Sequence, residues 1–167
     1  MQQITFSDES PLQKVISEQN VVCQIAKVLQ YFNIKDNYEI IVTICSDAEI
    51  QILNNQFRNK NKATDVLSFP MTDESFSIPG HQSLGEVVIS FETLQRQAKQ
   101  IGHGEKEEFY RLLVHGILHL LGYDHETSAE AEEEMQKLED ECLTLIFPRK
   151  SGDSQKTFDS SLELNSK

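Results

Sequence analysis

Three histidines stand close together at residues 115–125, which read HGILHLLGYDH. His115 and His119 are four residues apart, so on a helix their side chains leave one face with roots about 5–6 Å apart. Gly122 falls where such a helix can end in a left-handed cap, after which the chain can fold back and bring His125 to the same point. The spacing therefore predicts a metal site made of three imidazoles.

The number of ligands indicates the kind of site. Structural zinc sites are closed by four protein ligands, whereas catalytic sites use three and leave one position open. We therefore predict one Zn²⁺ ion held by His115, His119 and His125, with His115 also counted among the catalytic residues. A lone histidine is more often a hydrogen-bonded core or surface group, but three of the five histidines lie within this segment. His81 and His103 lack that context and are predicted to be surface residues.

The helix that carries the first two histidines is apolar almost all round. One polar stripe interrupts it, with members three or four residues apart: Glu108, Arg111, His115 and His119. On a buried helix such a stripe must face a cleft, a metal or satisfied polar partners. The stripe thus supports a site on this side of the helix.

The histidine spacing also occurs in metzincin proteases, whose pattern is H-E-x-x-H-x-x-G-x-x-H. Here Gly116 stands where those proteases carry the glutamate that acts as general base. Peptide hydrolysis needs that proton carrier because the amine leaving group must be protonated. A protease remains an alternative, but the missing carboxylate disfavours it.

The segment matches the H-G-x-L-H-L-x-G-Y-D-H signature of the YbeY family, metal-dependent single-strand endoribonucleases also described as ribosomal RNA maturation factors. Two further motifs resemble that family, LNNQFRNKNKATDVLSFP at 53–70 and LGEVVIS at 84–90. The similarity runs from about residue 38 to residue 147. It implies that His115, His119 and His125 bind zinc, that Arg58 lies beside the metal, and that the fold is an α/β sandwich with a mixed four-stranded sheet.

The resemblance implies cleavage of single-stranded RNA, in small-subunit ribosomal RNA 3′ end processing and ribosome quality control. Arg58 offers a planar fork suited to phosphate oxygens, and Lys60 and Lys62 could hold the neighbouring backbone. Such a charge run is otherwise a solvated loop. Ser68 is a weaker candidate for lining the groove. Asp65 could orient Arg58 or cap a turn. Asp124 could position a metal ligand, although an aspartate in a turn is just as often there for local backbone hydrogen bonds. The attacking oxygen, from water or from the RNA 2′-hydroxyl, stays open.

Two other functions fit the same residues. One is a ribosome assembly factor that binds RNA or a ribosomal protein and uses zinc chiefly for structure. The other is a metal-dependent hydrolase of another substrate, peptides included. Turnover of RNA, and its dependence on the metal, discriminates between these functions and the endoribonuclease.

The elements that must position these residues form an α+β pattern. Apolar periodicity and capping residues predict strands at 2–6, 38–46, 64–69 and 84–90 and helices at 11–33, 47–57, 91–101, 105–121 and 127–147. Strands concentrated in the first half suggest one sheet covered by about five helices. Residues 71–83 are expected to form a mobile loop. The three cysteines, an odd number without a CxxC pair, are expected to be buried free thiols in a reducing compartment.

The 167 residues suffice for one domain, which we place at residues 1–148, with a disordered tail at 149–167. No signal peptide or membrane span is recognisable, which predicts a cytoplasmic protein without a membrane partner. The net charge of −12 argues against general attraction to nucleic acid such as duplex DNA.

That charge is unevenly spread. Residues 126–148 hold eight carboxylates and one lysine, whereas residues 50–64 hold three basic side chains and no acid. The acidic helix keeps an apolar seam, predicted to consist of Ala131, Met135, Leu138, Cys142 and Leu145. A locally cationic groove at the metal site is therefore compatible with an acidic protein.

Overall fold

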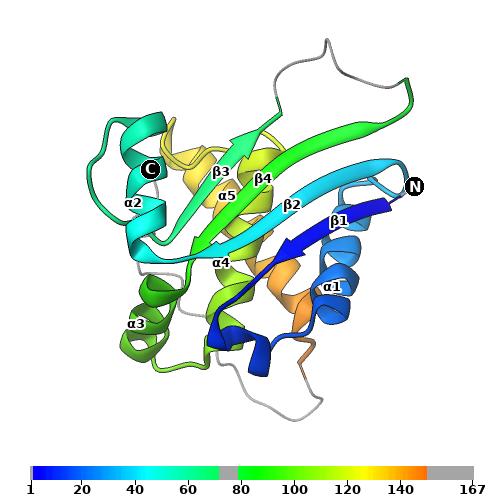
Figure 1. The fold of residues 1–167 in the computed structure, drawn as a ribbon. Helices are drawn as coiled ribbons and strands as arrows, with labels where there is room; N and C mark the ends of the chain where they lie inside the picture. The colour runs from blue at the N-terminus through cyan, green and yellow to red at the C-terminus, as the bar shows by residue number, and fades with distance from the viewer. Residues whose placement is uncertain (1, 72–78, 150–167) are drawn as a thin grey trace.

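A mixed sheet organises the chain in the computed structural model, which describes residues 2–71 and 79–149 (Figure 1). The elements, in chain order, are β1 (Gln2–Ser7), the 3-10 turn η1 (Pro11–Lys14), α1 (Glu18–Tyr31), β2 (Tyr38–Cys45), α2 (Asp47–Arg58), β3 (Val66–Pro70), β4 (Gln82–Ser90), α3 (Phe91–Ile101), α4 (Glu105–Leu120) and α5 (Ala129–Ile146). The strand order is β1-β2-β4-β3, and β3 pairs antiparallel with β4 while the other pairs are parallel. The predicted α+β fold with a mixed four-stranded sheet is confirmed.

The two faces of this sheet are covered unequally. Side chains alternate along a strand, so Val66 of β3 joins the large core that α1, α4 and α5 share, whereas Leu67 joins a small cluster with Ile50 of α2. Figure 1 shows α1, α4 and α5 behind the sheet and α2 beside β3. Because β3 is an edge strand, residues from α2 and from α4 can meet along its outer side.

The predicted helix at 11–33 is wrong in its first third. A 3-10 turn occupies Pro11–Lys14, and α1 begins only after Ser17, whose extended backbone and side-chain oxygen cap the helix by accepting from the Asn20 N–H. Leu12 and Ile16 are nevertheless buried in the same core as α1. The apolar periodicity of residues 11–33 therefore correctly indicated which side chains are buried. It did not reveal that the Ser17 cap separates the 3-10 turn from α1.

Three smaller expectations have different outcomes. Cys142 is buried, but the prediction is wrong for Cys23, which is exposed, and Cys45 is only half-buried. The expected loop at 71–83 lies mostly outside the described residues, and β4 already begins at Gln82. The tail beyond Arg149 also lies outside them. Within the described ranges, no helix combines the length and the apolar character needed to cross a membrane.

Candidate metal centre

Helix α4 supplies the first two histidines of the site. It is buried along most of its length, and Glu105, Glu107 and Glu108 in its first turn interact favourably with the helix dipole. His115 and His119 leave the helix on one side, with their Nε2 atoms 3.1 Å apart. Two nitrogen ligands of one tetrahedral zinc ion lie about 3.3 Å apart, given Zn–N bonds of about 2.0–2.1 Å.

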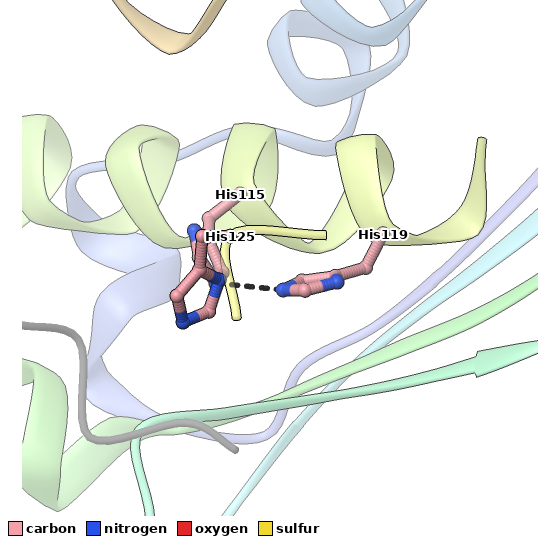
Figure 2. Close-up of side chains that lie close together, drawn as sticks. All are labelled: His115, His119 and His125. Atoms are coloured by element: carbon pink, nitrogen blue, oxygen red, sulfur yellow. Dashed lines mark hydrogen bonds between the residues drawn. The ribbon is translucent and has the colours of Figure 1, made fainter. Parts of the chain in front are cut away.

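The turn after α4 brings in the third histidine. Gly122 has a φ of 94°, in the left-handed region, and its N–H donates to the His119 carbonyl at 3.0 Å. The N–H of Tyr123 donates to the Leu118 carbonyl, also at 3.0 Å, which closes the helix end. The ring of His125 then lies 5.4 Å from that of His115 and 5.5 Å from that of His119, between centroids. The predicted glycine turn is confirmed. Figure 2 shows His125 beside His115 and His119.

The three imidazoles fit a metal ion. One ring nitrogen from each lies within 4.8 Å of the others. Nδ1 of His125 is buried, and among the described residues it has no hydrogen-bond partner, an arrangement that costs free energy unless a ligand completes it. Burial, and then the neighbouring His115 and His125, lower the pKa of His119 to about 4. His119 is therefore neutral at pH 7, as a metal ligand must be.

A carboxylate that the sequence analysis missed contacts this cluster. Glu139 of α5 accepts a hydrogen bond from Nδ1 of His115 at 2.5 Å, and both side chains are buried. This bond fixes the ring so that Nε2 keeps its lone pair for a metal. The sequence did carry a signal for Glu139. It stands at helical spacing with the apolar residues Met135, Cys142 and Ile146, and all four are buried. The predicted seam instead included Leu145, which is 40% exposed.

Gly116 explains how closely α4 approaches the sheet. A Cβ atom there would lie 2.6 Å from Cγ1 of Val87 on β4 and 3.3 Å from Oγ of Ser68 on β3. The Ser68 hydroxyl donates to the Gly116 carbonyl at 3.1 Å. Without a shift of the helix there is thus no room for the glutamate that metzincin proteases carry at this position. The geometry argues against the protease alternative.

Arg58 reaches the same place from α2. One terminal nitrogen of its guanidinium donates to the Ser68 carbonyl at 3.1 Å. A surface hollow beside β3 collects the predicted residues Arg58, Ser68, His115 and His119; its other lining residues are Val66, Leu67 and Pro70. The described lining includes neither Lys60 nor Lys62. The structure thus brings one predicted cation to the histidines and leaves the two lysines on the adjoining segment.

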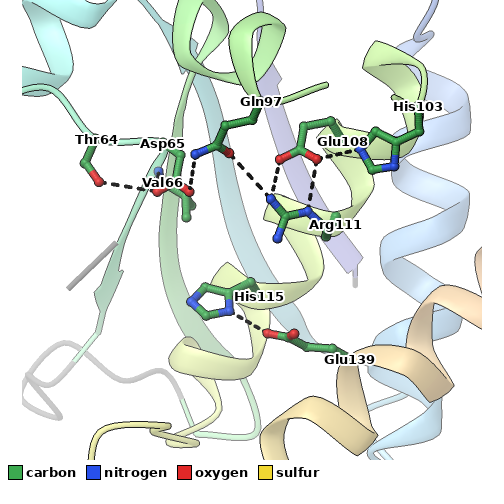
Figure 3. A network of polar contacts seen from close by, with 9 residues as sticks. All are labelled: Thr64, Asp65, Val66, Gln97, His103, Glu108, Arg111, His115 and Glu139. Carbon is green, nitrogen blue, oxygen red and sulfur yellow. Dashed lines mark hydrogen bonds and ion pairs between the residues drawn. The ribbon is translucent and has the colours of Figure 1, made fainter. Parts of the chain in front are cut away.

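Asp65 belongs to a different set of contacts, drawn in Figure 3. Its carboxylate accepts from Gln97 at 3.2 Å, and Gln97 in turn accepts from Arg111 at 3.5 Å. Arg111 pairs with the fully buried Glu108 at 2.5 Å, and Nε2 of His103 lies 2.7 Å from the same carboxylate. The first half of the polar stripe on α4 is therefore satisfied by protein partners, and only its second half carries the metal cluster.

Asp124 makes a local contact. Its Oδ1 accepts from the Glu126 N–H at 2.9 Å, the usual use of an aspartate in a turn. Its negative charge nevertheless acts on His119, where it opposes the lowering of the pKa. Among the described carboxylates near the cluster, Glu139 bonds directly to a histidine ring nitrogen. Glu126 lies 4.0 Å from Nε2 of His125.

Comparisons with known proteins agree with this geometry. The family model described as "Endoribonuclease YbeY" matches residues 3–146. Proteins named endoribonuclease YbeY from Leptospira biflexa and Persephonella marina are each 46% identical, over 144 and 141 residues, and these matches cover 85% and 84% of this chain and 92% and 88% of the relatives. The relative from Aquifex aeolicus is 50% identical over 111 residues, 66% of this chain and 72% of its own.

A solved structure shares the fold. The solution structure of TM1509 from Thermotoga maritima superimposes with a TM-score of 0.61 at 25% identity, over 91% of this chain and 99% of that one. The sequence signature, the histidine cluster and the family match over nearly the whole described chain point the same way. The chain belongs to the YbeY family of endoribonucleases.

Proposed function

We propose that this chain is a zinc-dependent endoribonuclease that cleaves single-stranded RNA. The observation that carries the proposal is the cluster of three imidazoles, two of which, His115 and His119, line one hollow beside β3 together with Arg58. A metal site adjoining a fixed cation suits a phosphodiester, whose charge must be neutralised in the transition state.

The residues divide the work as follows. His115, His119 and His125 would hold the zinc ion, which when bound supplies a Lewis acid and an activated water. Glu139 orients His115. Arg58, steadied by the Ser68 carbonyl, binds a phosphate oxygen next to the scissile bond. Further contributions are proposed for Lys60 and Lys62 toward neighbouring phosphates, and for Asp65 and Asp124 as supports outside the metal's own ligands.

We further propose ribosomal RNA as the substrate, at the 3′ end of the small-subunit RNA, and ribosome quality control as the setting. Membership of the family supports this assignment. It implies a cytoplasmic protein that meets the ribosome and some of its proteins. We propose residues 1–148 as the working domain, in keeping with the family match to residues 3–146.

The decisive experiment is cleavage of a single-stranded RNA by the purified protein, with and without a chelator, beside the His119→Ala variant. We expect the metal-loaded wild type to cleave, and we expect the chelator and the substitution each to lower the rate by at least about 100-fold. Full activity in His119→Ala would refute the metal mechanism. Equal RNA binding with no turnover in any sample would instead favour an assembly factor with a structural metal.

A further inference from the structure

An exposed aromatic pair lies at the corner where α2 meets β3. The ring of Phe57 packs edge-on against the ring of Phe69, with centroids 5.1 Å apart and planes at 65°. Phe69 is half-buried in the small cluster under α2, whereas Phe57 is 56% exposed. Phe69 therefore holds in place a ring that still offers much of its surface to solvent.

The pair adjoins the hollow of the candidate metal centre. The hollow is lined by Arg58, Ser68 and Pro70, among other residues. Phe57 immediately precedes Arg58 in the sequence, and Phe69 lies between Ser68 and Pro70. Ser68 points toward α4, since its hydroxyl bonds the Gly116 carbonyl, so Phe69 points to the opposite face of the sheet. The edge of β3 thus separates the aromatic pair from the metal cluster, and Arg58 reaches that edge at the Ser68 carbonyl.

The charges near the aromatic pair indicate which kind of ligand it would bind. Residues 50–64 contain Arg58, Lys60 and Lys62 and no acid, although the chain as a whole carries −12. The acid opposite Phe69 on β4, Glu86, accepts a hydrogen bond from the Thr43 hydroxyl at 2.7 Å. Cations that follow a phosphate backbone, combined with an exposed aromatic ring, are the features that bind single-stranded nucleic acids. A single exposed apolar side chain needs no explanation by itself, and Ile52 on the same helix is one, at 64% exposed. Ile52 lies about 140° around α2 from Phe57, away from this corner.

We propose that Phe57, supported by Phe69, is a stacking platform for one unpaired base of the RNA. While Arg58 holds a phosphate in the hollow, a neighbouring nucleotide turns over the outer side of β3 and lays its base on the Phe57 ring. A base inside a duplex is already stacked and paired, so it cannot do this, and the platform selects single-stranded RNA. The inference rests on the proposed function and adds to it a residue that distinguishes single-stranded from double-stranded RNA.

The test measures binding of short single-stranded oligoribonucleotides by fluorescence anisotropy, in a His119→Ala background that prevents turnover. If that variant does not fold, metal-stripped wild-type protein takes its place. The oligonucleotides are one intact sequence and a set in which each member lacks a single base. The platform variants are Phe57→Leu, which removes the ring, and Phe57→Trp, which keeps one. Ile52→Ala is the matched control, and circular dichroism verifies that each variant is folded.

We expect Phe57→Leu to weaken binding of the intact strand by about 5- to 150-fold, the range for loss of one stacked base, while Phe57→Trp and Ile52→Ala stay within about twofold. Removing one particular base should weaken binding by the same factor in the parent and have no further effect in Phe57→Leu. The inference is overturned if Phe57→Leu binds like Ile52→Ala, or if every single-base penalty persists in Phe57→Leu. If Phe57→Leu binds RNA like Ile52→Ala, the exposed ring is instead a contact for a protein partner.

These outcomes are separable from failure of the proposed function. Base-dependent binding through Phe57 with no cleavage by metal-loaded wild type would refute the nuclease and retain the platform. Cleavage by wild type, with no effect of Phe57→Leu on RNA binding, would support the nuclease and refute the platform. Absence of RNA binding in every sample, together with no cleavage by metal-loaded wild type, would overturn both.

Discussion

At the scale of single residues, the bond between His115 and Glu139 is expected to strengthen metal binding by the three imidazoles. The carboxylate holds the Nδ1 side of the ring, so that Nε2 is the nitrogen left to bind a metal ion. In Glu139→Gln the shape is kept and the charge is lost. We expect zinc affinity to fall by about 10- to 100-fold, as seen when such supporting carboxylates are changed. Competition with a chromophoric chelator measures it without reference to activity.

The control for this prediction lies on the same helix. Glu133 is exposed, so Glu133→Gln removes the same charge from α5 without touching His115. Its zinc affinity should match the wild type. If Glu139→Gln also matched the wild type, the Nδ1 contact would have no role in holding the metal.

The histidines and Glu139 differ in how far the sequence could reveal them. His115, His119 and His125 lie in one short segment, where helical geometry and a glycine turn fix their relation, so spacing alone predicted the cluster. Glu139 is 24 residues beyond His115, and its position depends on how α5 packs against α4. A carboxylate at a buried position of an apolar seam was the available signal, but the abundance of acids on that helix concealed it.

At the scale of elements, the closeness of α4 to the sheet depends on Gly116. In Gly116→Ala the new methyl group meets Val87 and Ser68 closer than van der Waals contact allows, so α4 must move outward. The steric clash should cost about 1–3 kcal/mol, against a gain of up to about 1 kcal/mol from replacing a helical glycine. We therefore expect a net decrease of up to about 2 kcal/mol in the free energy of unfolding. Urea denaturation of the metal-free protein measures it.

A second substitution shows whether the contact with Val87 is responsible. Val87→Ala removes the methyl groups that the new side chain would strike. The double variant should therefore be more stable than the sum of the two single losses predicts, by about 0.5–3 kcal/mol. Additive losses would mean that Gly116 matters for some reason other than its distance to β4.

Elements were predicted well where local and tertiary signals agree. The run YEIIVTIC became β2, and Ser46 with Glu49 forms the capping box that starts α2. The predicted helix at 11–33 failed because Leu12 and Ile16 show helical spacing while Ser17 caps a new helix. The closeness of α4 to β3 and β4 was not predictable either, because a glycine inside a helix has the same local signature whether it packs against a sheet or faces water.

At the scale of the whole molecule, the charge distribution limits how the protein can hold RNA. The net charge of −12 opposes broad contact with phosphates, and eight of the acids lie in residues 126–148. Arg58 lines the hollow, and Lys60 and Lys62 lie on the adjoining segment, so about three phosphates can be neutralised there. The logarithm of the binding constant falls linearly with the logarithm of the salt concentration, with a slope of about −0.7 for each neutralised phosphate of a single strand. For three phosphates we therefore expect a slope near −2 for binding of a short oligoribonucleotide.

Anisotropy titrations between low and moderate salt measure this slope, and Lys62→Gln should make it shallower by about 0.7 while leaving zinc affinity unchanged. A slope steeper than about −5 would contradict the local grip and require a cationic surface elsewhere on the molecule. A grip of three phosphates is weak by itself, so affinity must also come from the metal centre and from contacts with bases. That division makes binding depend on an accessible, unpaired strand, and general attraction to nucleic acid stays low because the rest of the molecule repels it.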